Sequence, residues 1–503
     1  MDNDNKKFHL HPVWFFIFLI VGTILLSVVL ALFNFQATQT DISLGSLSTS
    51  VLTVESLLSK DGIKFMISEC INNFQKFVPL GTLIVGLIGI SFGIKVGLFK
   101  SIFNKCTKFL PRKTAFFIFS LLCIVMGFSN DMAFVIMIPL AAIMFTEYKR
   151  SQVIGMTMAF VSVAAGSNIN LFTTSLDYSL LELARSSVNV IDPNYTYGYT
   201  GNLFFIVISS LLLALLISIV TDIYSKNKPV RIGNDEEEIG EKLDKRGLRK
   251  SFLALGIMIV IFVYSIIPGL PLSGFLLDSS QSMYVNKLFG ANAPFVNGIL
   301  YIVSLAFIIC SIIYGVTTKQ IINEKDIIKC LSGSLNGIGE MLILIFFAAQ
   351  FTALFRYTNI GQVVSVNLFN LVAESNASFV VLILLSFLAI AISNLLLPST
   401  SAKWQIFAPT LLPTFMKSNI TPEFTGAIFR LAASVTNPIT PLFSYFVIYV
   451  GFIGLYSKND FNIGKCYKLI WPYFITILIL WILIIFGWYV LKAPIGPNIF
   501  PTI

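Results

Sequence analysis

The chain has 503 residues, of which 56% are hydrophobic and only 12% are charged, and its mean hydropathy is +0.84. This composition excludes a soluble globular protein and indicates many membrane spans. The formal net charge of +9 does not indicate nucleic-acid binding, because the basic residues cluster in short loops between apolar segments. The positive-inside rule predicts this distribution for a membrane protein in contact with membrane lipid.

The N-terminal region, residues 1–75, is predicted to contain one membrane span and a polar outer loop. Its apolar run, residues 13–33, is too long for the core of a signal peptide and lacks a small-residue cleavage site. Lys6 and Lys7 precede this run, which places the N-terminus in the cytoplasm. The next span, residues 77–99, returns the chain to the cytoplasmic side.

Residues 114–146 are apolar but are interrupted by the polar sequence Ser129-Asn130-Asp131. Each half is roughly 15 residues long, which is shorter than the ~20 residues that cross a bilayer. Basic residues flank both ends of the segment. We therefore expect a re-entrant hairpin that enters from the cytoplasm and returns to it. Two short helices buried in the bundle are the alternative.

A broken helix and a further span complete a first repeat over residues 76–225. Residues 152–180 are expected to cross outward, with a break at residues 166–170, where Gly, Ser and Asn interrupt the apolar pattern. Asp177 lies near the outer end of this segment. Residues 202–225 are long and apolar enough to cross inward.

A charged linker separates the first repeat from the rest of the chain. Residues 226–250 carry mixed charges and are predicted to be a solvated cytoplasmic linker without a function of their own. Two connecting spans follow within residues 251–330. The second repeat, residues 331–503, begins with another span.

The second repeat contains another interrupted hairpin and another broken helix. Residues 376–416 are apolar around a polar interruption at residues 398–403, and we expect a hairpin that enters from outside. Residues 423–455 are expected to cross inward, with a break at residues 434–441. The last span then leaves the C-terminus outside.

The two halves share spacings between polar residues and prolines. The serine of each hairpin tip precedes a proline by ten residues, and an alanine precedes the asparagine of each break by five. These pairs are Ser129 and Pro139, Ser399 and Pro409, Ala165 and Asn170, and Ala432 and Asn437. Together with the Lys/Arg topology, they predict an all-α polytopic membrane protein with nine transmembrane helices and two opposed re-entrant hairpins, related as an inverted repeat.

Hairpin tips and helix breaks expose groups that bind ions. Carbonyl, hydroxyl and amide oxygens suit Na⁺, and the N-terminus of a half-helix suits an anion. Each Ser or Thr taken alone is better explained by a hydrogen bond to its own helix, so the prediction rests on the paired clusters. The candidate ion-coupling residues are Asp177, Asp131, Asn130, Asn168, Ser399, Thr436 and Asn437. The candidate ligands of Na⁺ are Asn130, Asn168, Asn170, Ser399 and Asn437.

Charged and aromatic residues near these breaks are candidates for substrate binding and coupling. Arg430 lies in an apolar stretch, where a charge is costly and usually functional, and its guanidinium matches a carboxylate; a structural partner is the alternative. Asp131 and Asp177 are candidate carriers of an ion or proton, although Asp177 could be merely solvated. Lys403 is either a fixed cation or a residue that snorkels. Trp404 either stacks on an aromatic substrate or packs.

Cysteine and histidine usage argues against an enzyme. The six cysteines are scattered without a CxxC pair, which fits neither a disulfide framework nor a metal site. The two histidines, His9 and His11, precede the first span, which argues against a buried Ser-His-Asp triad or a His-rich metal site. We expect no cofactor other than Na⁺ or H⁺ as a coupling ion.

Two motifs and the arginine between them resemble the p-aminobenzoyl-glutamate transporter (AbgT) family of the ion transporter superfamily. The motifs are Ser401-Ala402-Lys403-Trp404 and Thr436-Asn437-Pro438-Ile439-Thr440-Pro441, and Arg430 lies between them. Supporting matches in the same order are Ser129-Asn130-Asp131, Asn170-Leu171 and Phe347-Ala348-Ala349-Gln350. The resemblance covers residues 10–490.

The resemblance implies a homodimeric secondary transporter of the bacterial inner membrane. Activities of the family are uptake of p-aminobenzoyl-glutamate and efflux of sulfonamide-like antimetabolites. The functional positions that it implies are Asp177, Ser401, Trp404, Pro422, Arg430 and Pro441. The candidate substrate-binding residues are therefore Ser401, Trp404, Arg430, Pro422, Pro441 and Asn170.

One position departs from the family pattern. The family commonly has an aspartate three residues after the arginine, and Ala433 stands there in this chain. Coupling then falls to Na⁺, or to H⁺ through another acid such as Asp177. The expected function is ion-coupled transport of a small carboxylate such as p-aminobenzoyl-glutamate. A proton-driven exporter of sulfonamide-like antimetabolites is the alternative, and a channel is a third reading.

Overall fold

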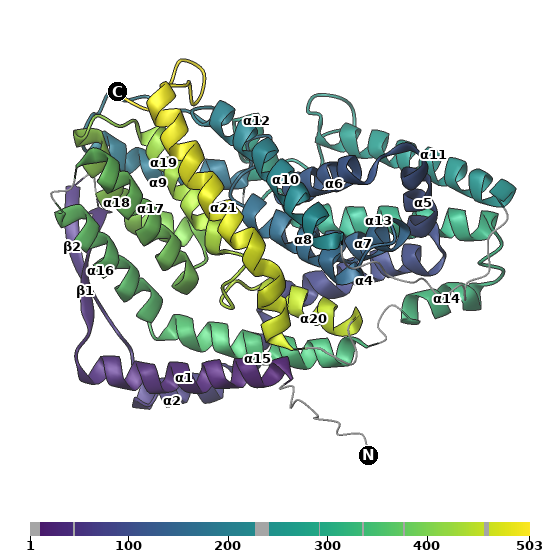
Figure 1. Ribbon diagram of the computed structural model, residues 1–503, viewed down its shortest axis with the longest axis horizontal. Helices are drawn as coiled ribbons and strands as arrows, with labels where there is room; N and C mark the ends of the chain where they lie inside the picture. The colour runs from purple at the N-terminus through teal and green to yellow at the C-terminus, as the bar shows by residue number, and fades with distance from the viewer. Residues whose placement is uncertain are drawn as a thin grey trace. The chain divides into compact units, whose positions relative to one another are not determined.

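The computed structural model describes residues 11–43, 46–226, 241–290, 292–333, 337–375, 378–456 and 462–503. These residues form helices α1 to α21 and one two-stranded sheet (Figure 1). The prediction of a helical fold is thus confirmed. The sheet was not predicted.

Seven of the described helices are long and apolar enough to cross a membrane. The two remaining predicted crossings are each built from two shorter helices, α8 and α9 in the first and α19 and α20 in the second. The count of nine spans stays a prediction. The seven helices are α1 (Pro12–Leu32), α4 (Val78–Lys95), α10 (Leu203–Ser225), α11 (Glu241–Ile266), α13 (Pro294–Thr317), α15 (Ile338–Tyr357) and α21 (Ile463–Leu491).

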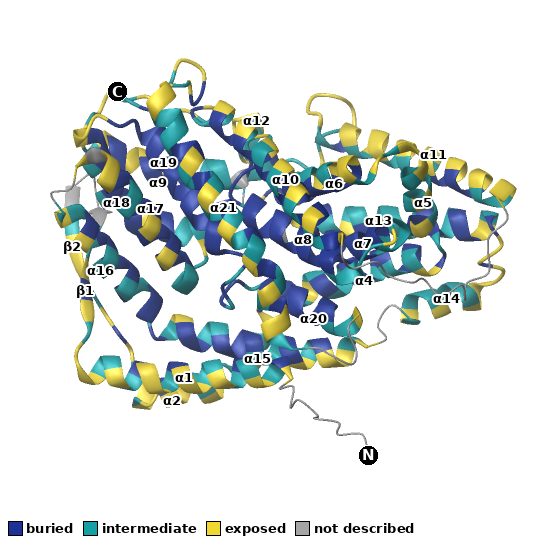
Figure 2. Cartoon of the chain, in the orientation of Figure 1, coloured by how far each residue is buried: buried dark blue, intermediate teal, exposed yellow. Residues whose placement is uncertain are grey.

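The long helices expose apolar side chains as lipid-facing helices do. Helices α1 and α11 are the least buried of them (Figure 2). On α11, Leu253 and Val260 are exposed, and Leu25 is exposed on α1. Exposed apolar surface of this extent marks a membrane or protein interface, so these surfaces agree with the membrane environment that the composition indicates.

The chain divides into two compact units. The first unit comprises residues 1–80, 180–209 and 339–503, and the second comprises residues 81–179 and 210–338.

In the first unit, helix α19 (Pro422–Thr436) is entirely buried and packs against α17 (Phe379–Leu396), α18 (Thr400–Lys417) and α21. Helices α17 and α18 are the arms of the second interrupted segment and are joined through residues 397–399. Helix α20 (Phe446–Tyr456) follows the break after α19. The predicted second hairpin segment thus contains two helices separated by a short connection, and its re-entrant path from the outside stays a prediction.

The polar outer loop that is predicted after the first span contains two strands and two short helices. Strands β1 (Gln36–Ser43) and β2 (Ser46–Thr53) pair antiparallel, with Gln36 opposite Thr53, and β1 packs on α18 and α16 (Ile360–Glu374) (Figure 1). Asn367 and Asn370 of α16 donate side-chain hydrogen bonds to β1 carbonyls. Two short helices, α2 (Lys60–Ser68) and α3 (Cys70–Gln75), complete the region.

In the second unit, α7 (Asn130–Glu147) and α6 (Arg112–Met126) both pack on α8 (Gln152–Gly166). The rings of Phe116 and Phe145 are stacked with centroids 4.4 Å apart. Gly155 allows this approach, because a Cβ there would lie 2.5 Å from the ring of Phe145. Helix α5 (Leu98–Phe109) packs on α7, and α11 packs on α13.

Short helices and helical extensions replace several predicted loops. Helix α9 (Ser175–Asn189) follows the break after α8, and α11 begins at Glu241, so the last part of the predicted linker 226–250 is helical. Residues 227–240 of that linker lie outside the described residues. Helices α12 (Tyr284–Phe289) and α14 (Glu324–Ser332) lie before and after α13 in the chain.

The order of helices is the same in the two halves of the chain. Helices α4 to α10 comprise a long helix, a shorter one, two hairpin arms, two halves of a broken helix and a long helix, and α15 to α21 repeat this order. The inverted orientation of the repeats stays a prediction.

Candidate functional site

A single buried amide joins the hairpin arms to the break after α19. Asn394, near the end of α17, donates from its amide nitrogen to Oγ1 of Thr436 at 2.9 Å and to Oδ1 of Asn437 at 2.8 Å. Its Oδ1 accepts a hydrogen bond from the ammonium group of Lys403 on α18. One side chain thus connects α17, α18 and the end of α19.

Threonine hydroxyls tie the same break to carbonyls of α17. Thr436 donates to the carbonyl of Ala391 at 2.9 Å, and Thr440 donates to the carbonyl of Leu395 at 2.6 Å. These bonds run to another helix, so the alternative of a bond to its own helix does not hold for Thr436. A cation at Thr436 would have to replace bonds that the hydroxyl already makes.

Lys403 and Trp404 are both buried at the start of α18. The Lys403 side chain is 0% exposed, so it does not snorkel. The indole N–H of Trp404 donates to the carbonyl of Leu180 at 2.9 Å, and its ring packs against Phe429 with centroids 4.6 Å apart. In this conformation, packing accounts for Trp404 without a substrate.

The remaining predicted residues of the first unit lie on α18, on α19 and in its break. Arg430 is only 4% exposed and lies in the middle of α19. Pro422 is the first residue of α19, after the capping hydroxyl of Thr421. Ser399 caps α18 through the backbone N–H of Ala402 and is exposed. Ser401 on α18 and Pro441 in the break are partly exposed.

In the second unit, Asn170 joins the break after α8 to the hairpin arm α6. Its amide nitrogen donates to the carbonyls of Ile124 at 3.2 Å and Val125 at 3.1 Å, in the last turn of α6. Its Oδ1 accepts from the N–H of Leu171 at 2.8 Å. The N–H of Gly127 also donates to the Ile124 carbonyl and the N–H of Phe128 to the Val125 carbonyl, so Asn170 adds a second donor to each carbonyl at this helix end.

The other predicted residues of the second unit lie near the same hairpin tip or after the break. Asn168 is buried in the break, and Asp131 is partly buried in the first turn of α7. Asn130 is the first residue of α7. Asp177, in the first turn of α9, accepts hydrogen bonds at Oδ2 from the N–H and hydroxyl of Thr174, at 2.6 and 2.8 Å. Asp177 therefore has a local structural bond and is not merely solvated.

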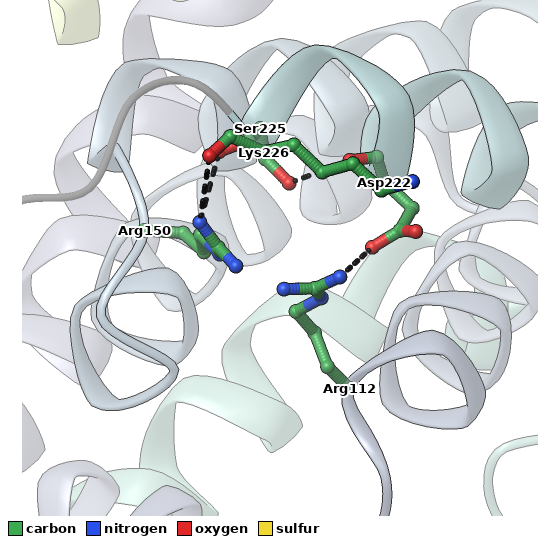
Figure 3. A network of polar contacts seen from close by, with 5 residues as sticks. All are labelled: Arg112, Arg150, Asp222, Ser225 and Lys226. Carbon is green, nitrogen blue, oxygen red and sulfur yellow. Dashed lines mark hydrogen bonds and ion pairs between the residues drawn. The ribbon is translucent and has the colours of Figure 1, made fainter.

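Two arginines that were not among the predicted site residues, Arg112 and Arg150, contact the end of α10 (Figure 3). Arg112, the first residue of α6, forms an ion pair of 2.6 Å with Asp222 of α10. Arg150, just after α7, donates to the carbonyls of Ser225 and Lys226 at 3.2 Å. A cation at a helix C-terminus is favourable. Asp222, an acid in the last turn of an apolar span, was the sequence feature that could have indicated this ion pair.

The comparisons with known proteins agree with the two motifs. The model of the AbgT putative transporter family matches residues 7–503. The p-aminobenzoyl-glutamate transport protein of Escherichia coli (strain K12) is 28% identical over 502 residues, which cover 98% of this chain and 94% of that protein.

Two solved structures are similar along nearly the whole chain. The YdaH transporter of Alcanivorax borkumensis has a TM-score of 0.51 and 28% identity, covering 97% of this chain and 100% of that chain. MtrF of Neisseria gonorrhoeae, from a class of antimetabolite efflux pumps, has a TM-score of 0.48 and 29% identity, covering 98% of both chains.

Proposed function

We propose, from the premise that this chain belongs to the AbgT transporter family, that it is an ion-coupled secondary transporter of a small carboxylate such as p-aminobenzoyl-glutamate. The E. coli relative named for that substrate aligns with 98% of the chain. We place the protein in a bacterial inner membrane as a homodimer, with the N-terminus inside and nine spans around two opposed hairpins.

The observation that carries the proposal is the burial of Arg430. Its guanidinium group is on a helix that is buried along its whole length, and the side chain is only 4% exposed. A charge removed from water is retained where it serves binding or transport. The planar guanidinium presents two parallel N–H groups to a carboxylate. We therefore assign Arg430 to the carboxylate of the substrate.

The coupling residues divide between the two units. We propose that Asn130, Asp131, Asn168 and Asn170 of the second unit form one candidate ion site, with Asp177 nearby in sequence. In the first unit, Lys403 already places an ammonium group on the Asn394 amide. Ser399, Thr436 and Asn437 are accordingly the weaker candidates for Na⁺, because Thr436 and Asn437 already accept hydrogen bonds from the Asn394 amide and Ser399 already caps α18.

Uptake of radiolabelled p-aminobenzoyl-glutamate into proteoliposomes tests the proposal. We would impose an inward Na⁺ gradient, an inward proton gradient or neither, for the wild type, Arg430→Ala and Arg185→Ala. Arg185 is an exposed arginine paired with Glu182 and is the matched control. Gradient-driven uptake should persist in Arg185→Ala and be lost in Arg430→Ala. Wild-type protein that shows no uptake under any gradient would reject this substrate and favour the exporter.

A further inference from the structure

Glu423 is a buried acid at the start of α19 that no part of the sequence analysis selected. Its side chain is 0% exposed. Oε2 accepts a hydrogen bond of 2.8 Å from the phenolic O–H of Tyr195, in the segment between α9 and α10. Oε1 is buried and has no hydrogen-bond partner among the described residues. One carboxyl oxygen is therefore satisfied, and the other can carry a proton.

Two glycines allow the segment over residues 190–202 to close on this acid. A Cβ at Gly201 would lie 2.6 Å from Cγ of Glu423. A Cβ at Gly426, one turn further along α19, would lie 3.1 Å from the phenolic oxygen of Tyr197. Larger side chains at these two positions would push the segment away from α19. The carboxyl group thus lies in a close-fitting polar enclosure.

Glu423 forms no ion pair with a described residue. Arg430 lies two turns away on α19, about 10 Å along the axis. A carboxylate removed from water requires a cation or several donors. Among the described residues, the donors to Glu423 are the phenolic O–H of Tyr195 and the backbone N–H of Glu423 itself. Helix α17 carries no charged residue. The other titratable groups of the neighbouring elements are Lys403 and Lys417 of α18, Lys465, Cys466, Tyr467, Lys468, Tyr473 and Tyr489 of α21, Lys492 after it, and Asp192, Tyr197 and Tyr199.

Tyr195 is suited to remain the donor in this pair. Burial, followed by the charge of Glu423, raises the pKa of Tyr195. Its phenol therefore keeps its proton over the working pH range of a transporter, and it can donate to Oε2 whether or not Oε1 is protonated. The proton that varies is then the one on Glu423.

We infer that Glu423 binds and releases the coupling proton, with Tyr195 as its positioning residue. The inference rests on the proposed function for its link to transport. The step adds one proton to Oε1 and removes it again, while the hydrogen bond from Tyr195 to Oε2 persists. It supplies an acid on the same helix as Arg430, in a chain whose position 433 is alanine.

A substrate-free measurement tests proton binding directly. Infrared spectra of the purified protein would be recorded as the pH is raised, for the wild type, Glu423→Gln and Glu182→Gln. Glu182 is an exposed acid and is the matched control. The wild type and Glu182→Gln should show one carboxylic-acid component that persists above the pH at which the exposed acids ionise and then disappears, and Glu423→Gln should lack that component. Identical spectra in all three proteins would overturn the inference.

A transport measurement tests coupling. With the membrane potential held at zero, one inward pH unit can drive about tenfold accumulation for one proton per substrate. The wild type should accumulate labelled p-aminobenzoyl-glutamate, whereas Glu423→Gln should only exchange it, at a rate within about twofold of wild type. Accumulation by Glu423→Gln would overturn the inference. If the wild type does not transport this substrate, the proposed function fails, and the infrared titration still decides proton binding.

The variant Tyr195→Phe separates positioning from simple packing. A hydrogen bond donated to a carboxylate favours its ionised form, so loss of the phenolic O–H should move the midpoint of the infrared titration to higher pH. Proton-driven accumulation should keep its extent and shift its pH optimum in the same direction. A midpoint that stays at the wild-type pH would contradict the role given to Tyr195.

Discussion

Lys403 of α18 donates a hydrogen bond from its ammonium group to Oδ1 of Asn394 of α17, and both side chains are excluded from solvent. The bond joins the two arms of one hairpin close to its tip. Since the Asn394 amide nitrogen also reaches Thr436 and Asn437, the same residue holds the break of α19 in place. The hydrogen bonds of Asn394 therefore hold the end of α17, the start of α18 and the end of α19 together.

Removal of the ammonium group should weaken this cluster. Lys403→Met keeps most of the side-chain volume but leaves the amide oxygen of Asn394 buried without its donor, which should lower the free energy of unfolding by about 1–3 kcal/mol. The measurement is denaturant unfolding of the purified protein in detergent. In a double-mutant cycle with Asn394→Leu, the two losses should not add. Strict additivity would show that the two side chains act independently.

Local signals in the sequence were sufficient for the long apolar helices and for the two polar interruptions. The polar interruption at Ser129 lies between helices α6 and α7, and the one at Ser399 lies between α17 and α18. These features could be predicted because the length of an apolar run and the presence of a polar turn depend only on neighbouring residues. The strands over residues 36–53 were missed, since their Ser and Thr residues resemble a polar loop, although Thr and Val also favour strands.

The partners of the buried polar residues could not be predicted. Tyr195 and Glu423 are 228 residues apart in sequence, and Asn394 and Asn437 are 43 apart. No periodicity or spacing encodes which distant side chains meet. Glu423 follows Pro422 at a predicted helix start, where an acid is ordinarily explained by the helix dipole, so only its complete burial distinguishes it.

The ion pair of Arg112 with Asp222 should stabilise the open end of the first hairpin. Asp222→Asn removes a buried negative charge that pairs with the partly exposed guanidinium group of Arg112, so the free energy of unfolding should fall by about 1–3 kcal/mol. The exposed pair of Arg185 and Glu182 is the control, and Glu182→Gln should cost less than about 1 kcal/mol. If the two substitutions lower the free energy of unfolding by the same amount, the ion pair of Arg112 with Asp222 contributes no more than an exposed pair.

The substitution Trp404→Phe distinguishes packing from substrate stacking. Phenylalanine can still pack against Phe429 but cannot donate to the carbonyl of Leu180, so the free energy of unfolding should drop by about 1 kcal/mol. The KM for transport should change by less than about threefold if the indole does not contact substrate. A larger rise in KM without a loss of stability would assign the ring to the substrate instead.

The two roles of Asn170, as a tie and as an ion ligand, predict different salt dependence. Asn170→Ala removes one donor from each of two carbonyls in the last turn of α6, which should lower the free energy of unfolding by about 0.5–1.5 kcal/mol. If the tie is the whole role, the loss should be the same in Na⁺ and in K⁺ at equal ionic strength. If Oδ1 also binds Na⁺, the wild type should be stabilised by Na⁺ and the variant should not, because a ligand that binds only the folded state adds stability through mass action. Thermal unfolding of both proteins across a Na⁺ series measures the difference. The matched control is Asn367→Ala, which also removes an amide donor to a backbone carbonyl but lies outside the candidate ion sites.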